Sequence, residues 1–213
     1  MSRITRLILV RHGESTGNSE GILCGWHDSS LTEKGIAQAE RVALVLKDAG
    51  INAIISSDLQ RAKQTSLIIS KQLGLDVCFD ERFRERACGI FDGKKIDDLK
   101  NHESWENFVN DSNFTLEGGE SIVDFSKRIS ESCEMIAREH EGENILLISH
   151  GGVLWAMVPY VLGVSASSYN GLIGMDNCSI SVFSRHDENW VLQTLNSTQH
   201  LGGAFLDAHS WRL

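Results

Sequence analysis

The chain has 213 residues, of which 41% are hydrophobic and one is proline, a composition typical of a globular fold with a sizeable core. Its formal net charge of −9 opposes attraction to nucleic acid and to anionic membranes, so we expect neither as a partner. The five cysteines are scattered without C-x-x-C spacing, which favours reduced thiols in a cytoplasmic protein over a disulfide framework or a zinc site. No apolar stretch approaches the roughly 20 residues that cross a bilayer.

The first predicted strand is the apolar run from Leu7 to Val10, which has no polar alternation. Such a run is typical of a strand that is buried on both faces of a parallel sheet. It stops at Arg11-His12-Gly13. These residues are therefore predicted at the carboxyl end of a buried strand, where ligands bind in open α/β sheets.

Helices and strands alternate after this run. Thr32 is the predicted N-cap of a helix that Ala49-Gly50 closes. Residues 51–55 predict a second buried strand, and residues 77–79 predict a short third one. This alternation predicts an α/β fold with a mostly parallel sheet.

A second helix follows the strand at residues 51–55. Ser57 or Asp58 is its predicted cap, and it runs to about Leu73. Arg61 is then in its first turn, near the same rim of the sheet as His12. Taken alone, an arginine at such a position is more often a solvent-facing side chain than a ligand.

The segment between residues 80 and 121 has a different character. Residues 80–93 are dense in charge and predict a loop over the rim, while residues 94–108 are weakly helical. Residues 115–121 form a glycine-rich turn. Because the region at about 89–120 lacks buried-strand character, we predict a helical cap inserted into one domain that spans residues 1–213.

The second half of the chain repeats the opening pattern. A helix begins at Ile122, and the apolar strand Ile145–Ser149 ends in His150-Gly151-Gly152. Two closing strands are predicted at residues 179–184 and 190–194. Two buried strands that each end in His-Gly can bring two imidazoles to one crevice.

The residues at these strand ends suit phosphoryl transfer. Neutral imidazole, as in His12, is a nucleophile toward phosphorus. Arg11 and Arg61 carry planar guanidinium groups that neutralise phosphoryl oxygens. Gly151-Gly152 are at the start of a predicted helix, where the backbone N–H groups attract an anion. His150 adds positive charge if it is protonated. Because His12 must be neutral to attack, activity should fall at acid pH, judged against a reference pKa of about 6.5.

The reaction also needs an acid that protonates the leaving oxygen. Sequence spacing alone leaves Glu81, Glu85 and Asp92 open for this role. The sequence contains no H-E-x-x-H or P-loop motif, which disfavours the common metalloprotease and nucleotide-binding sites.

These motifs together resemble the histidine phosphatase superfamily, also called the phosphoglycerate mutase-like family. The matching blocks occur in family order, and they are Leu9–Ser15 (LVRHGES), Leu31–Gly35 (LTEKG), Ser56–Thr65 (SSDLQRAKQT), Arg84-Glu85 with Gly89 and Asp92-Gly93, Gly119–Ser121 (GES) and Ser149–Gly152 (SHGG). The resemblance implies a three-layer α/β/α sandwich with the cap over the pocket.

The resemblance also implies roles for individual residues. His12 would be the phosphorylated nucleophile, and Glu85 would be the general acid and then the base. The remaining pocket residues would be Arg11, Arg61 and His150 around the phosphate, with Asn18, Gly25 and Gly151 as further substrate contacts. The family needs no metal and no other cofactor, because the arginines neutralise the phosphate.

Within the family, three departures favour a phosphatase over a mutase. Mutases typically have H-G-N where this chain has His150-Gly151-Gly152, and a tyrosine where it has Cys88. They carry paired arginines before the G-E-S-like turn, whereas Asn101–Gly118 has no arginine or lysine. The ending Asn196–Leu201 resembles that of broad-specificity and α-ribazole-type phosphatases.

We therefore expect a metal-independent phosphomonoesterase that acts on a small phosphorylated metabolite, with a homodimer as one option for its assembly. Two alternatives remain. One is phosphoglycerate mutase-type phosphoryl transfer, and the other is a non-catalytic regulatory binding module of the same fold.

Overall fold

The computed structural model describes residues 3–165 and 175–202. Its centre is a six-stranded sheet in the order β3-β2-β4-β1-β5-β6. The strands are β1 (Ile4–Arg11), β2 (Ala53–Ser56), β3 (Val77–Phe79), β4 (Asn144–Ser149), β5 (Ile180–His186) and β6 (Asn189–Ser197). All the strands that the sequence predicts within the described residues are present.

The sheet is mixed, with parallel pairing among its first four strands. β1 pairs with β4, β4 with β2 and β2 with β3 in parallel, whereas β5 and β6 run antiparallel. The register between β1 and β4 sets Arg11 opposite Ser149. Because parallel strands end at the same edge, the next residues, His12 and His150, emerge side by side.

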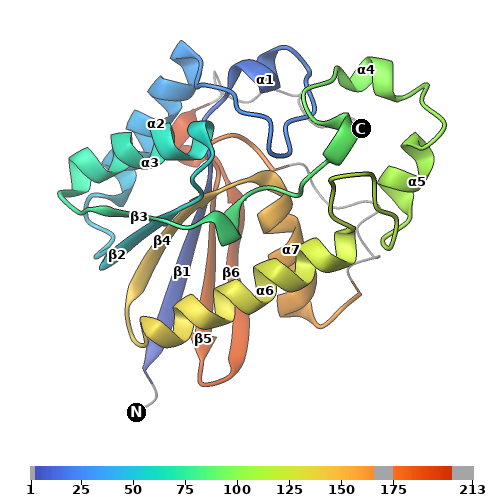
Figure 1. Ribbon diagram of the computed structural model, residues 1–213. Helices are drawn as coiled ribbons and strands as arrows, with labels where there is room; N and C mark the ends of the chain where they lie inside the picture. Colours follow the sequence, from blue (N-terminus) through green and yellow to red (C-terminus); the bar gives the residue numbers. More distant parts are fainter. Residues whose placement is uncertain (1–2, 166–174, 203–213) are drawn as a thin grey trace.

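Helices cover both faces of the sheet (Figure 1). The described helices are α1 (Thr16–Ser19), α2 (Glu33–Leu46), α3 (Gln60–Leu73), α4 (Ile96–Leu99), α5 (Trp105–Asn110), α6 (Ile122–Glu139) and α7 (Gly151–Leu162), with 3-10 turns at η1 (Glu81–Phe83), η2 (Gly89–Phe91) and η4 (Gln199–Leu201). The fold is a three-layer α/β/α sandwich, as predicted.

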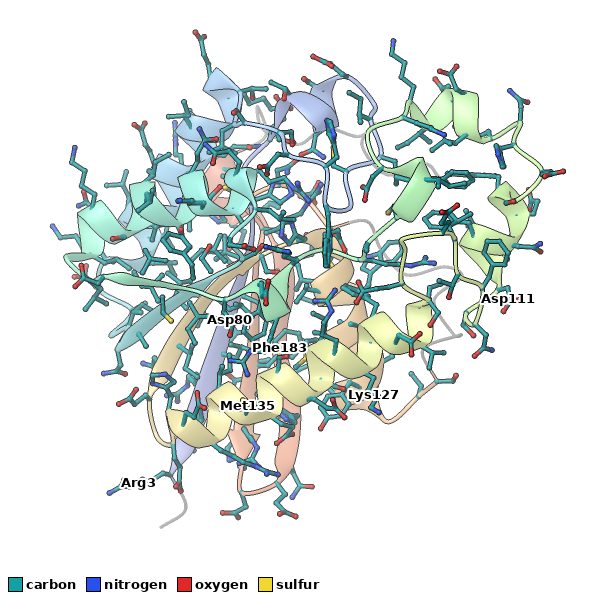
Figure 2. All side chains as sticks on the ribbon, viewed as in Figure 1. Arg3, Asp80, Asp111, Lys127, Met135 and Phe183 are labelled. Atoms are coloured by element: carbon teal, nitrogen blue, oxygen red, sulfur yellow. The ribbon has the colours of Figure 1, made fainter. Side chains whose placement is uncertain are left out.

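Successive residues of β1 contribute to two different cores. Leu7 and Leu9 pack with α6 and α7, and Phe183, which is labelled in Figure 2, lies in the same cluster. Ile8 and Val10 point to the other face and pack with α2 and α3. This two-sided burial explains why the strand is continuously apolar from Leu7 to Val10.

The predicted cap of α3 is wrong, although the helix itself is confirmed. Its N-cap is Leu59, which makes no side-chain cap, and Asp28 accepts the hydrogen bond from Gln60 N at 2.9 Å. Asp58 instead binds Arg84, with Nε donating at 2.7 Å. A charged partner from another loop outcompetes the local amide for this carboxylate, and a distant carboxylate takes its place. By contrast, α2 has the predicted N-cap Thr32.

Residues 88–116 contain a small hydrophobic cluster separate from the two cores of the sandwich. Its buried members are Cys88, Phe91, Leu99, Trp105, Phe108 and Leu116. Isolated bridges join Ile22 to Lys95 and Cys88 to Gly119. The segment predicted as a cap thus packs on its own aromatic centre. Nowhere in the described part of the chain is a helix both long and apolar enough to span a bilayer.

Candidate active site

His12 follows β1 and is buried, with 3% of its surface exposed. Its Nδ1 donates to the carbonyl oxygen of Gly13 at 2.7 Å. Its Nε2 accepts from the Nε–H of Arg61 at 3.2 Å. Because one nitrogen donates and the other accepts, the contacts assign a neutral imidazole whose Nε2 carries the lone pair.

Burial lowers the pKa of His12 well below its ordinary value of 6.5, and the charges of Arg61 and Arg11 lower it further. The neutral form of His12 therefore persists to a lower pH than the reference pKa of a histidine indicates. The fall of activity at acid pH stays a prediction, but it should be judged against a pKa of His12 below 6.5.

Arg61 lies in the first turn of α3 and is 1% exposed, so it is not the solvent-facing side chain that its position alone favoured. Its Nη2 donates to the carbonyl oxygens of Cys24 at 2.9 Å and Gly25 at 2.8 Å. Its Nη1 donates to the carbonyl oxygen of His27 at 3.0 Å. The loop that contains these three carbonyls fixes the guanidinium plane against His12.

Arg11 ends β1 and is also buried, with 4% of its surface exposed. Its Nη1 donates to the carbonyl oxygen of Met175. Burial lowers the pKa of Arg11 to about 9, while the nearby carboxylate of Glu85 opposes that shift. The side chain stays protonated at neutral pH, so Arg11 and Arg61 place two cations at one buried rim.

His150 is the N-cap residue of α7 and is fully buried. Its ring centroid lies 5.2 Å from that of His12 in an edge-on arrangement, and its Nε2 is hydrogen-bonded to the Ser57 hydroxyl at 2.8 Å. Burial and the charge of Arg61 lower the pKa of His150 well below 6.5. A bound phosphate dianion opposes that shift, because an opposite charge favours the protonated form.

The structure distinguishes among the three acids that sequence spacing left open. Glu85 Oε2 accepts from Gly152 N at 3.0 Å, so this carboxylate lies at the N-terminus of α7 beside His150. Glu81 has a side chain that is 74% exposed and pairs with Arg84. Asp92 accepts backbone N–H bonds instead. Only Glu85 of these three lies against the helix that His150 begins.

Gly152 is packed directly against this carboxylate. A Cβ atom built on Gly152 would lie 1.9 Å from Glu85 Oε1, so no side chain fits at this position while Glu85 keeps its place. The sequence predicted that the amides of Gly151 and Gly152 attract an anion. The anion on the Gly152 amide is the protein's own Glu85 carboxylate. The positive end of the α7 dipole favours a negative charge at this position.

Two predicted substrate contacts have additional partners within the protein. The Asn18 Oδ1 accepts from Ser15 N at 3.2 Å and from Asn177 Nδ2 at 3.2 Å. The Gly25 N–H donates to Asp92 Oδ1 at 2.6 Å, and the Gly25 carbonyl binds Arg61. Gly25 thus reaches the pocket through Arg61. The direct contacts of Asn18, Gly25 and Gly151 with substrate stay predictions.

Three supporting residues were not predicted as site residues from the sequence. Thr65 Oγ1 accepts from Gly13 N at 3.0 Å, and Ser57 holds His150. Asn177 Nδ2 donates to the carbonyl oxygen of His12 at 3.0 Å. Ser57 and Thr65 lie inside a motif that was recognised, so a reading of its other positions could have found them. Asn177 had no signal.

The assembled site can bind and transfer a phosphoryl group. Arg61 faces a neutral imidazole, a second buried cation, Arg11, lowers the pKa of the same ring, and a carboxylate lies at a neighbouring helix N-terminus. Such groups neutralise equatorial phosphoryl oxygens, supply a nucleophile and supply an acid. Across residues 3–165 and 175–202, no group of three or more His, Cys, Asp or Glu side chains is arranged to hold a metal ion.

Comparisons with known proteins agree with this geometry. The chain is 37% identical over 212 residues to a probable phosphoglycerate mutase, GpmB, of Escherichia coli O1:K1, covering 95% of this chain and 97% of that protein. A mycobacterial glucosyl-3-phosphoglycerate phosphatase superposes with a TM-score of 0.81 at 30% identity, over 92% of this chain and 100% of that one. A putative α-ribazole-5'-P phosphatase from Escherichia coli K-12 superposes at 0.82 with 27% identity, over 91% and 96% of the two chains. The model of the histidine phosphatase superfamily (branch 1) matches residues 7–198, and the chain therefore belongs to that superfamily.

Proposed function

We propose that this chain is a phosphomonoesterase that hydrolyses a small phosphorylated metabolite through a phosphohistidine at His12. The observation that carries the proposal is the pairing of a neutral His12, whose lone pair faces Arg61, with a Glu85 carboxylate held at the start of α7. The first group attacks phosphorus, and the second manages the proton.

The reaction proceeds in two steps. In the first, His12 Nε2 forms a bond to phosphorus, the ester P–O bond breaks, and protonated Glu85 gives its proton to the leaving oxygen. In the second, the Glu85 carboxylate takes a proton from water, the water oxygen bonds to phosphorus, and the P–N bond breaks. Arg11 and Arg61 neutralise the phosphoryl oxygens in both steps.

Phosphoryl transfer to a second acceptor is the other candidate, favoured by the name of the probable phosphoglycerate mutase to which the chain is similar. Two features support hydrolysis instead. Mutases typically have an asparagine at the position of Gly152, and here Glu85 fills the space that such a side chain would need. In addition, Asn101–Gly118 offers no arginine or lysine to hold a substrate carboxylate. Water can accept the phosphoryl group without a binding site for a carboxylate, so these features favour hydrolysis.

The deciding experiment measures phosphate release and phosphoryl transfer side by side. The wild-type protein and His12→Ala are incubated with an aryl phosphate, and then with 3-phosphoglycerate plus a bisphosphoglycerate primer, in the presence of a chelator. Release that disappears in His12→Ala supports the phosphatase. Interconversion of phosphoglycerates faster than phosphate release identifies a mutase, and release that persists in His12→Ala contradicts the proposed nucleophile.

The assignment of Glu85 needs its own control. Glu85→Ala removes the carboxylate at α7, whereas Glu81→Ala removes an exposed carboxylate four residues earlier. We expect formation of the phosphoenzyme to slow by at least 100-fold in Glu85→Ala alone, within the range of general acid catalysis. Equal rates in the two variants contradict the assignment.

A further inference from the structure

We infer that Asp92 is a positioning residue that ties the loop holding Arg61 to the segment that carries Glu85. The inference rests on the proposed function, because it assigns Asp92 to the phosphate pocket and the acid of that same site. Asp92 does not touch the reacting atoms. It acts through the backbone of residues 24–27 and 85–88.

Both carboxylate oxygens of Asp92 accept backbone N–H groups. Oδ1 accepts from Gly25 N at 2.6 Å. Oδ2 accepts from Trp26 N at 3.1 Å and from Cys88 N at 3.3 Å. Hydrogen bonds from backbone N–H to an ionised carboxylate are among the stronger ones in proteins, so this side chain joins two separate loops.

The first of these loops holds Arg61. The carbonyl oxygens of Cys24, Gly25 and His27 accept its Nη hydrogens at distances between 2.8 and 3.0 Å. The Nε–H of the same guanidinium points at His12 Nε2. A loop displaced from Asp92 therefore displaces the guanidinium that faces the nucleophile.

The second loop holds the acid. The Trp26 indole Nε1–H donates to the Glu85 carbonyl oxygen at 2.8 Å, and Cys88 lies three residues after Glu85. Asp92 thus binds the backbone N–H of Trp26, and the Trp26 side chain in turn binds the Glu85 carbonyl oxygen. One carboxylate sets the spacing between the phosphate pocket and the proton donor.

The approach of the first loop requires a glycine. A Cβ atom built on Gly25 would lie 2.7 Å from Asp92 Oδ1, 2.5 Å from the Arg86 carbonyl oxygen and 2.8 Å from Cys88 N. The last two are backbone atoms, which cannot rotate away. Gly25 and Asp92 are therefore complementary parts of the same junction.

Asparagine cannot replace Asp92 in this position. Its amide has one acceptor oxygen and one NH₂ group. In either orientation, the NH₂ group faces a backbone N–H, either that of Gly25 or those of Trp26 and Cys88. Donor then opposes donor, and one of the two loops loses its anchor.

The test measures the affinity for inorganic phosphate by calorimetry, which requires no turnover. We expect Asp92→Asn to weaken phosphate binding by about tenfold or more, because loss of a hydrogen bond to a charged group costs on that order. The matched control is Asp97→Asn in α4, where the side chain is 92% exposed, and it should bind phosphate as the wild type does. Equal affinities of Asp92→Asn and the wild type overturn the inference.

A double-mutant cycle with Arg61→Lys separates positioning from a general loss of structure. If Asp92 acts through Arg61, the penalty of Asp92→Asn shrinks when the guanidinium is already gone, whereas independent effects add. Additive losses overturn the inference. Gly25→Ala disturbs the same junction while the Asp92 carboxylate stays intact. This variant replaces Asp92→Asn in the test if Asp92→Asn fails to fold. It should weaken phosphate binding by a similar factor.

The outcomes for the two proposals remain distinct. A wild-type protein that binds phosphate but hydrolyses no ester contradicts the proposed function and leaves the affinity comparison valid. A wild-type protein that hydrolyses esters while Asp92→Asn keeps full phosphate affinity contradicts only the role of Asp92. A wild-type protein that binds no phosphate contradicts both.

Discussion

The Nε–H of Arg61 points at the Nε2 of His12 across 3.2 Å, while the Nδ1 of the same ring is held by the Gly13 carbonyl oxygen. A fixed cation beside the lone pair favours the neutral imidazole, and in the proposed reaction it defines the direction from which phosphorus approaches. As the bond to phosphorus forms, the same Nε–H can donate its hydrogen bond to a phosphoryl oxygen instead of to His12 Nε2. In the proposed reaction, this one contact thus orients both the nucleophile and the cation that binds the phosphoryl group.

The pH dependence of the reaction should reflect this environment. Because burial, Arg61 and Arg11 lower the pKa of His12, its neutral form persists below the ordinary value of 6.5. We expect the acid limb of kcat/KM to lie below pH 6.5, measured with an aryl phosphate and corrected for the ionisation of the substrate at about pH 6. An acid limb at or above pH 6.5 contradicts this prediction.

Replacing Arg61 with lysine should be severe despite the conserved charge. An ammonium group has three donors on a flexible stem, and it cannot reach three carbonyls and His12 in one plane. We expect kcat/KM to fall by about 100-fold or more, and unpaired buried carbonyls to cost about 1–3 kcal/mol of stability. Arg138→Lys, in a side chain that is 68% exposed, is the control and should leave both quantities unchanged. Near wild-type activity of Arg61→Lys excludes a planar binding role.

Gly152→Ala should act through Glu85. The added methyl would lie 1.9 Å from Glu85 Oε1, so the carboxylate must leave the N-terminus of α7. We expect kcat to fall by about 100-fold, within the range attributed to general acid catalysis. The check is the same substitution in a Glu85→Ala background, where no carboxylate remains to be displaced. A penalty of equal size in both backgrounds shows that Gly152 acts by another route.

Buried neutral histidines should also make stability depend on pH. The pKa values of His12 and His150 are lowered in the folded protein, so below about pH 6.5 the unfolded chain binds protons that the folded chain does not. The free energy of unfolding should therefore decline from pH 6.5 downward, by up to roughly 1.4 kcal/mol per pH unit for each histidine. Urea denaturation in phosphate-free buffers measures it.

Two substitutions attribute this decline to the buried rings. His150→Gln removes one of them and should flatten the dependence, whereas His102→Gln, at an exposed position, should leave the slope unchanged. A slope that is the same in the wild type and in His150→Gln contradicts the assignment.

Much of the fold was predictable because burial leaves a direct signature in the sequence. β1 and β4 pack on both faces, so each contains a continuous apolar run, residues 7–10 and 145–148, and a polar residue marks the point where each run ends. The helices that cover them repeat their apolar residues with helical spacing. The α3 cap was mispredicted because its acceptor, Asp28, is 32 residues away, beyond the reach of local patterns.

The choice of Glu85 as the proposed general acid shows the limit of sequence spacing as a guide. Glu81, Glu85 and Asp92 lie within twelve residues and have similar chemistry, and the family resemblance rather than periodicity chose Glu85. In the folded chain their contacts differ. Glu81 is exposed to solvent and pairs with Arg84, Glu85 binds the start of α7, and Asp92 accepts backbone N–H groups.

The sequence by itself determined the α/β class, the positions of the strand ends and the residue types that gather there, because hydrophobic periodicity and motif order are local properties of the chain. Only the tertiary structure decided the neutral tautomer of His12, the loop carbonyls that orient Arg61, the need for glycine at position 152 and the anchoring role of Asp92. Those features depend on atoms brought together from distant segments, and their distances and burial exist only after the layers have packed.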